Sequence, residues 1–305
     1  MKFIITVDTE ADNQWHSDGK LTLENIKAIP KFQALCERCN YAPTYFVTYE
    51  VADSDEAMSI LLPLERSGRA EIGAHLHPWT TPPYVDEAQE KRLMHFPSEL
   101  SDTSLRAKFT TLHERLAARL GYAPTSFRAG RWGIDERVEA LLREYRYEAD
   151  CSVTPYVNWR RTVRGGELRR LPNFRNAFPL PSHLGDGLVE LPMTILPRGW
   201  ETLSTWGADM LGRGSLAITW CRIFPETTIH ELIDVYHSAK QRGLPYLEFM
   251  IHSSELILGG SPYTKTNEAL EHLYTTLEEY FDFLASMGVS GISATRAAKE
   301  WKRFS

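Results

Sequence analysis

Long apolar stretches are missing from this sequence of 305 residues. No run of about 18 apolar residues occurs, so a membrane-spanning helix is not expected. The short apolar segment that follows Met1 and Lys2 ends at Asp8, and it lacks the length and the small-residue cleavage site of a secretory signal. We therefore expect a cytoplasmic protein with no membrane span.

An excess of basic residues is also missing. The chain has 34 Lys and Arg against 40 Asp and Glu, which gives a formal net charge of -6. The stretch 160–170 is locally basic, but Gly165 and Gly166 interrupt it, and we interpret it as a solvated loop or hairpin. This balance argues against a nucleic-acid partner.

Cysteine is scarce, with four residues in the whole chain. Cys36 and Cys39 form a single C-x-x-C at the end of a helical pattern. A structural zinc site would require a second pair, and a redox motif would normally follow a strand. We interpret these cysteines as ordinary thiols, which is typical of a reducing compartment.

Strand-like and helix-like segments alternate along the chain. Short apolar runs predict strands at 3–7, 44–48, 70–74, 126–128, 246–251 and 291–292, and one that reaches residue 150. Apolar residues at helical spacing predict helices at 22–39, 54–68, 102–120, 135–145, 202–220, 228–242 and 267–287, and a short one at the C-terminus. We also expect a hairpin around 188–191 and a Pro-rich insertion at 78–97.

This alternation predicts an α/β protein with a parallel sheet covered by helices. Six or seven β-α units with no linker between halves favour a closed or nearly closed barrel, in a single domain over residues 1–305. The functional groups of such barrels lie at the carboxyl ends of the strands.

Polar side chains occur where five of the predicted strands end. They are Asp8 with Glu10, His75 with His77, Arg128, Asp150 and His252. In an extended chain, residues two positions apart point to the same side. We therefore expect each of the first two pairs to face one shared centre.

Five segments resemble the successive motifs of polysaccharide deacetylases, the NodB-homology group also known as carbohydrate esterase family 4. They are TVDTE at 6–10, EIGAHLHP at 71–78, FRAGRW at 127–132, DCS at 150–152 and FMIH at 249–252. The resemblance implies a distorted (β/α)7-type barrel and one divalent metal ion, with zinc as the first candidate. It also implies hydrolysis of N-acetyl groups on a saccharide substrate.

The resemblance implies that Glu10, His75 and His77 hold the metal ion. Two imidazoles and one carboxylate leave a position on a metal such as Zn²⁺ open for water. Two features depart from the family pattern, because Thr9 separates the first two carboxylates and the two histidines are closer together than usual. Three residues therefore stay open as alternative third ligands: His16, His95 and Asp12.

The resemblance also implies an acid and a base. Asp8 would be the general base, held ionised by Arg128, and His252 the general acid, with Asp150 setting its charge and tautomer. Hydrolysis of an amide requires such an acid because an amine is a poor leaving group unless it is protonated. We expect three aromatic side chains to contact the sugar at the mouth of the barrel: Trp132, Trp79 and Tyr263.

Two other functions stay open. The same scaffold could hydrolyse a small cyclic amide or ureide, because a fold does not settle the substrate. The altered histidine spacing also suits a catalytically silent saccharide-binding relative. Against that second alternative, a protein that only binds has no use for the acid and base set.

Overall fold

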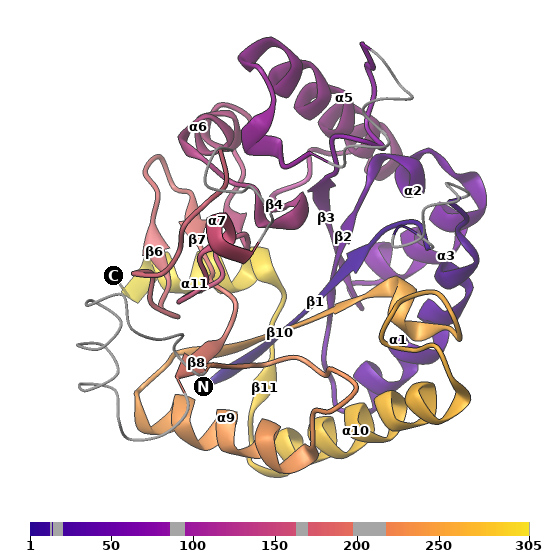
Figure 1. Cartoon of the computed structure of the whole chain (residues 1–305), viewed down its shortest axis with the longest axis vertical. Coiled ribbons are helices and arrows are strands. Elements are labelled where there is room, and N and C mark those ends of the chain that lie inside the picture. Colours follow the sequence, from indigo (N-terminus) through magenta and orange to yellow (C-terminus); the bar gives the residue numbers. More distant parts are fainter. Residues whose placement is uncertain (13, 15–20, 86–94, 163–169, 198–217, 305) are drawn as a thin grey trace.

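A twisted and largely parallel sheet runs through the centre of the molecule (Figure 1). The computed structural model describes residues 1–12, 14, 21–85, 95–162, 170–197 and 218–304. The strands of the sheet are β1 (Lys2–Thr9), β2 (Thr44–Val47), β3 (Glu71–Leu76), β4 (Ser126–Ala129), β5 (Ala149–Asp150), β6 (Ser182–His183), β7 (Val189–Glu190), β10 (Tyr246–His252) and β11 (Ser290–Gly291).

The strands follow the order β10-β1-β2-β3-β4-β5-β7-β6, and β11 pairs with β1. Every neighbouring pair is parallel except β6 with β7. Leaving aside β6 and β11, the described residues thus form a row of seven parallel strands. The distorted (β/α)7-type barrel expected from the sequence is confirmed.

The barrel is open between β7 and β10, and irregular chain lies across the opening. The backbone N–H of Met193 donates to the carbonyl of Val153 at 3.0 Å, and that of Thr194 donates to the carbonyl of Glu248 at 3.3 Å. In return the Glu248 N–H donates to Oγ1 of Thr194 at 2.8 Å. The strands β8 (Ile195–Pro197) and β9 (Ile218–Trp220) pair in antiparallel fashion, and β8 follows Thr194 directly. These contacts join the last part of the sheet to the first without a paired strand.

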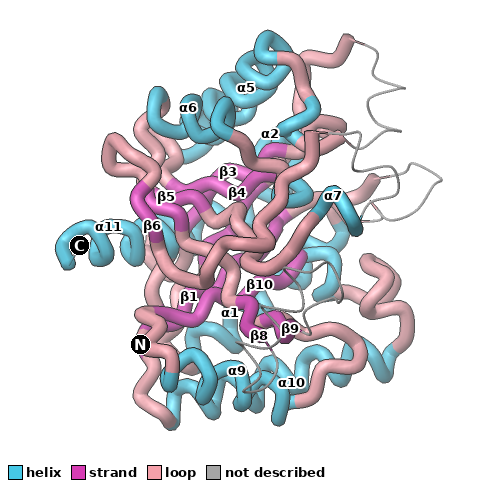
Figure 2. The backbone as a smooth tube through the Cα atoms, turned by 60° about the vertical axis from the view of Figure 1, so that its left-hand side comes forward, coloured by secondary structure: helices cyan, strands magenta, loops and turns pink. Residues whose placement is uncertain are grey.

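Helices lie around the sheet (Figure 2). They are α1 (Ile29–Arg38), α2 (Tyr49–Asp53), α3 (Asp55–Arg66), α5 (Asp102–Leu120), α6 (Glu136–Glu144), α7 (Trp159–Thr162), α9 (Ile229–Gln241), α10 (Asn267–Ser286) and α11 (Ala294–Phe304), with 3-10 helices η1 (Glu24–Ala28), η2 (Pro97–Glu99), η3 (Gly130–Trp132) and η5 (Ser253–Leu256). Local sequence sets several ends. Ser54, Ser101 and Thr228 each accept a backbone N–H at a helix start, and Gly121 ends α5 with φ of 84°.

Burial explains why the strands are so apolar. Every residue of β1 from Phe3 onward is buried, as expected for a parallel strand covered on both faces. Phe3 packs against the ring of Tyr41 and against Tyr280 and Phe281 of α10, with ring centroids 5.2–6.0 Å apart. The same strand ends in Asp8 and Thr9, so a rigid apolar element positions the polar site.

One predicted segment differs from the structure, a second is present with an additional strand pairing, and a third lies partly outside the described residues. The segment 218–220, expected at the end of a helix, is the strand β9, where β-branched and aromatic residues pair with β8; residues 198–217 lie outside the described part. The predicted hairpin is present between β6 and β7, but β7 also pairs in parallel with β5. Of the segment 78–97, residues 86–94 lie outside the described part.

No described helix is long and apolar enough to cross a membrane.

Candidate active site

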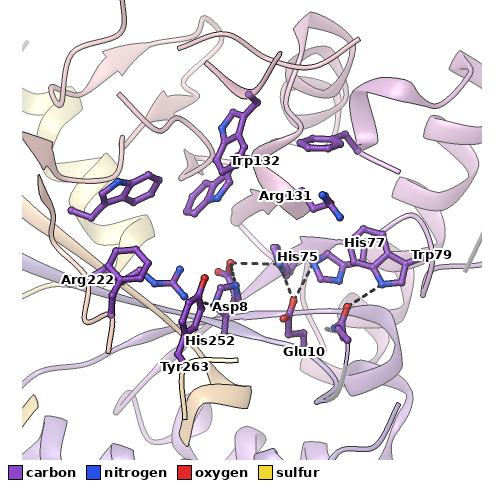
Figure 3. Close-up of a pocket in the computed structure, with 15 residues that line it drawn as sticks. Asp8, Glu10, His75, His77, Trp79, Arg131, Trp132, Arg222, His252 and Tyr263 are labelled. Atoms are coloured by element: carbon purple, nitrogen blue, oxygen red, sulfur yellow. Dashed lines mark hydrogen bonds and ion pairs between the residues drawn. The ribbon is translucent and has the colours of Figure 1, made fainter. Parts of the chain in front are cut away.

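Parallel pairing brings the predicted polar residues to one edge of the sheet. The register places Asp8 opposite His252 in β1 and β10, and His75 opposite Arg128 in β3 and β4. Figure 3 shows Asp8, His75 and His252 pointing toward one another across these strand ends. The site is therefore assembled from strands whose positions the hydrophobic core fixes.

Glu10, His75 and His77 form a buried cluster beside Asp8. One ligand atom from each of the three lies within 4.8 Å of the others. Nε2 of His77 is 3.2 Å, and Nε2 of His75 is 3.8 Å, from Oε2 of Glu10. Because β3 is extended up to Leu76, the short histidine spacing places both rings on one side.

The protonation of these residues fits a bound cation. Nδ1 of His75 lies 2.9 Å from the carbonyl of Arg128, which can only accept, so the proton is on Nδ1 and the Nε2 lone pair faces the carboxylates. Burial lowers the pKa of His75. Burial and the neighbouring imidazole of His75 lower the pKa of His77 well below its ordinary value. Burial and the charge of Asp8 raise the pKa of Glu10 well above its usual range. Lone pairs that converge in this way suit a divalent metal ion.

The alternative third ligands are engaged elsewhere or cannot be placed. Asp12 accepts hydrogen bonds from Thr22 and from the backbone of Asn25. His95 lies 3.5 Å from Glu99, and His16 lies outside the described residues. Among the described residues, the cluster that could hold a metal ion is therefore Glu10, His75 and His77.

Close packing fixes the His77 ring. The Trp79 indole stacks on it with centroids 4.1 Å apart, and donates from Nε1 to Oε1 of Gln14 at 2.9 Å. On another side lies Gly130, where an added Cβ would be 2.4 Å from Cδ2 of His77 and 2.5 Å from the carbonyl of Leu76. The glycine that follows β4 is thus required by the approach of a site histidine.

Arg128 connects Asp8 to a second buried carboxylate. Its guanidinium donates from Nη1 to Oδ1 of Asp8 at 2.7 Å, from Nε to the carbonyl of Cys151 at 2.8 Å, and from Nη2 to Glu248. The arginine is fully buried between the rings of Phe46 and Trp132. Burial alone would raise the pKa of Asp8, but Arg128 and the neighbouring histidines lower it below its ordinary value. Asp8 is therefore ionised, and its Oδ2 points at the cluster, 3.6 Å from Nε2 of His75.

His252 lies across Asp8 from the cluster. Its Nε2 is 3.9 Å from Oδ2 of Asp8. Its Nδ1 lies 2.7 Å from Oε1 of Glu255 and 3.0 Å from Nη2 of Arg222. The ring therefore presents Nε2 to the site while Nδ1 faces a charged pair.

Asp150, expected to orient His252, has other partners in the structure. Its Oδ1 accepts from the Ser152 hydroxyl at 2.5 Å, and it lies beside Glu190, whose Oε1 accepts from the N–H of Val153. Asp150 is at the end of β5, and four strands lie between β5 and β10 in the sheet order. Glu255 takes the position beside His252 that was expected for Asp150.

A cavity of about 370 Å³ opens over these residues. Trp132, Trp79 and Tyr263, the three aromatic residues predicted for the mouth, all line it. Further lining residues are Gln14, Phe96, Arg131, Trp159, Trp220, Arg222 and Phe224. Figure 3 shows Trp132 and Arg131 over the cluster, and Arg222 with Tyr263 beside His252.

Solved structures share this architecture. Proteins from Mycobacterium smegmatis and Pseudomonas aeruginosa PAO1 that are assigned as polysaccharide deacetylases superpose with a TM-score of 0.54 each. They are 15% and 16% identical to this chain, and the matches cover 98% and 99% of it and 90% of each of those chains. The chain has the fold of the polysaccharide deacetylases.

The polysaccharide-deacetylase fold also occurs in proteins with other names. The PuuE allantoinase superposes with a TM-score of 0.55 at 15% identity, over 98% of this chain and 89% of that one. No protein-family model matches the sequence, and no curated protein sequence matches it significantly. At these identities the comparisons establish the fold, and the chemistry has to be argued from the site.

Three site residues were not assigned a role from the sequence. Glu248 is the one charged residue within the apolar segment 246–251, and a charge inside a buried strand is a usable signal. Glu255 follows His252 by three positions, a spacing that a helix or turn cap explains equally well. Arg222 lies in an irregular segment, where nothing in the local pattern indicates contact with β10.

Proposed function

We propose that this protein is a metal-dependent hydrolase that removes an N-acetyl group from a sugar. The observation that carries the proposal is the buried Glu10, His75 and His77 cluster, with the ionised carboxylate of Asp8 beside it. Two histidines and one carboxylate form a catalytic ligand set typical of zinc, which makes zinc the first candidate. Once bound, such an ion supplies Lewis acidity: it polarises a carbonyl group and lowers the pKa of water.

Asp8 is suited to act as the base. It is ionised and lacks a proton, and Arg128 holds Oδ1 so that Oδ2 faces the cluster. In the proposed reaction a water molecule attacks the acetyl carbon and its proton passes to Oδ2. The pairing with Arg128 fixes the carboxylate before the substrate arrives, so little reorganisation is needed at the moment of attack.

His252 is suited to act as the acid. The C–N bond breaks as a proton moves from Nε2 of His252 to the departing nitrogen, so that acetate and a free amine result. Nε2 lies on the open side of Asp8, 3.9 Å from Oδ2. Acid and base thus flank one position where the scissile amide would lie, as general acid–base catalysis requires.

The aromatic lining supports a sugar substrate. The ring centroid of Trp220 lies 6.5 Å from that of Trp132 and 6.4 Å from that of Phe224. The centroid of Tyr263 lies 5.8 Å from that of Phe224. These rings form one continuous wall of the cavity. The C–H face of a sugar ring is apolar, and it would pack on such a wall while hydroxyl and amide groups turn toward the polar floor.

A second candidate is the hydrolysis of a cyclic amide or ureide. The similarity to the PuuE allantoinase, with a TM-score of 0.55, favours it as much as the other comparisons favour a deacetylase. The acid, base and cluster would serve both reactions, and the difference would lie in what the aromatic wall accepts. A substrate panel separates the two.

The test measures acetate release from a panel of N-acetylated amino sugars and their oligomers, and ring opening of cyclic ureides, by the zinc-loaded protein. Deacetylation that is lost in Asp8→Asn supports the proposal. Activity on ureides alone supports the second candidate. Absence of both activities in metal-loaded protein would contradict the catalytic reading and favour a saccharide-binding relative, which a binding assay with the same sugars would detect.

A further inference from the structure

One oxygen atom of Glu255 gathers three donors around His252. Oε1 lies 2.7 Å from Nδ1 of His252, accepts from the backbone N–H of His252 at 3.0 Å, and accepts from Nη2 of Arg222 at 2.6 Å. Glu255 is 1% exposed and Arg222 is 6% exposed. The three residues thus form a nearly water-free network behind the imidazole.

The network determines which ring nitrogen carries a proton. Burial alone would raise the pKa of Glu255, but Arg222 and the hydrogen bond with His252 lower it. An ionised carboxylate only accepts hydrogen bonds, so Nδ1 must donate. Arg222 also only donates, so its 3.0 Å contact with Nδ1 is between two donors that share one acceptor.

The remaining surroundings fix the direction of Nε2. Among the described residues, the charged groups around His252 include Glu255 and Arg222 on the Nδ1 side and Asp8 of β1 on the Nε2 side, with the neutral imidazole of His75 beyond Asp8. Arg222 is itself restrained, because Nη1 contacts Sδ of Met250 at 2.9 Å and its guanidinium lies over the Phe224 and Tyr263 rings. The imidazole cannot turn over without breaking this arrangement.

We propose that Glu255 is a positioning residue for His252: with Arg222 it keeps Nδ1 protonated, so that the acid form of the ring, protonated on both nitrogens, presents its Nε2–H to the leaving nitrogen. The inference rests on the proposed function, in which Nε2 gives its proton to the amine as the C–N bond breaks. Nδ1 keeps its proton throughout, and solvent restores the one on Nε2. Glu255 thereby supplies the role that the sequence had suggested for Asp150.

A merely structural role for Glu255 makes a different prediction. Glu255 also caps η5, since it accepts the N–H of His252 at its start. That cap requires only an acceptor, which the isosteric Glu255→Gln retains through its amide oxygen. The substitution therefore removes the charge and keeps the cap.

The leaving group separates the two roles. With the most reactive N-acetylated amino sugar of the panel, we expect Glu255→Gln to lower kcat about 100-fold with little change in KM, which is the lower range of what a positioned acid supplies. With 4-nitrophenyl acetate, whose phenolate departs without a proton, we expect nearly wild-type turnover. Glu231→Gln is the matched control, because Glu231 makes the same kind of cap at α9, where it accepts the Thr228 N–H at 3.1 Å.

A second measurement does not depend on activity. ¹⁵N-NMR of labelled wild-type protein should show His252 protonated at Nδ1, and Glu255→Leu, which offers no acceptor, should lose that fixed protonation. Arg222→Lys, which keeps a cation beside Glu255, should retain the tautomer and most of the amide hydrolysis. A His252 that is protonated only at Nε2 in the wild type would overturn the inference.

The outcomes distinguish failure of the inference from failure of the proposed function. Equal loss with amide and ester, or no loss with either, would overturn the positioning role while leaving the deacetylase proposal intact. A wild-type protein that cleaves no N-acetylated sugar would defeat the proposed function, and the NMR measurement would still decide the tautomer.

Discussion

Asp8 and Glu10 lie two positions apart on one strand end, yet their surroundings shift their pKa values in opposite directions. Both are buried, which alone raises the pKa of a carboxyl group. Asp8 faces Arg128, whose charge lowers its pKa below the ordinary value. Glu10 faces Asp8 and two neutral imidazoles, and its pKa rises. The protein thus supplies Asp8 with a cation, the Arg128 guanidinium. Glu10 has no such partner in its cluster and is placed to bind a metal cation from solution.

This difference predicts separable effects of substitution. Asp8→Asn should retain the metal ion and lower turnover by about 10²–10⁴-fold, because it removes the base and leaves the three ligands. His75→Ala should lose both metal and turnover. Metal content by elemental analysis, alongside acetate release, checks both. Equal metal content in the two variants would contradict the assignment of roles.

Asp150 and Glu190 form a second buried acidic pair, and they predict a pH dependence of stability. Burial, with Glu139 nearby, raises the pKa of Asp150 to about 6 from its ordinary 3.8. The folded state therefore binds more protons than the unfolded state between about pH 4 and pH 6, so this pair's contribution to the free energy of unfolding falls as the pH rises through that window. The loss attributable to Asp150 is about 3 kcal/mol, at about 1.4 kcal/mol for each pH unit.

Asp150→Asn removes that cost. Relative to wild type, the variant should gain unfolding free energy between pH 4 and pH 7, measured by urea denaturation. Asp234→Asn, on the exposed side of α9, controls for the loss of a carboxyl group in general. Parallel stability curves for wild type and Asp150→Asn would show that Asp150 ionises as readily in the folded as in the unfolded chain.

At the scale of elements, one side chain holds three strands together. Arg128 of β4 pairs with Asp8 of β1 and with Glu248 of β10, and Glu248 also accepts from the Thr6 hydroxyl at 2.6 Å. Three strands lie between β4 and β10 in the strand order, so this network crosses the interior of the curled sheet.

Arg128→Met should lower the free energy of unfolding by about 3–5 kcal/mol, because it leaves two buried carboxylates without a counter-charge. Adding Glu248→Gln to it should recover part of the loss, since one of those charges is removed. Urea unfolding of the single and double variants measures this. A double variant that is less stable than Arg128→Met would contradict the view that Arg128 stabilises the fold by compensating the charges of Asp8 and Glu248.

The junction of β4 with η3 gives a second element-scale prediction. Gly130→Ala would place a methyl group against His77, and we expect metal affinity to fall about 10–100-fold, as for other residues that orient ligands. Gly291→Ala is the control, because its methyl group would meet Tyr41 at 2.7 Å, far from the site in the strand β11. Both should lose stability, but only the first should lose affinity in a metal titration. Equal affinities in the two would contradict the positioning of His77 by Gly130.

At the scale of the whole molecule, the barrel and the main cluster were predictable because they follow from periodicity and strand ends. Buried parallel strands have continuous apolar runs, and their carboxyl ends meet, so Asp8, His75 and His252 could be brought together from the sequence. Side chains that reach the site from irregular segments could not be predicted in this way. Arg222 reaches His252 from an irregular segment after β9, and only the folded chain places it there. Asp150 was assigned by its motif position, but the pairing of β5 with β7 places Glu190 beside it, and Ser152 donates a hydrogen bond to it from two residues along the chain.

Elemental analysis of metal content tests the central claim most directly. It compares the purified, zinc-loaded wild-type protein with the His75→Ala/His77→Ala double variant. Three protein ligands in one cluster predict about one equivalent of metal in the wild type, and none retained by the variant. A wild-type protein that takes up no metal, or a variant that binds as much as wild type, would contradict a metal-dependent site at Glu10, His75 and His77.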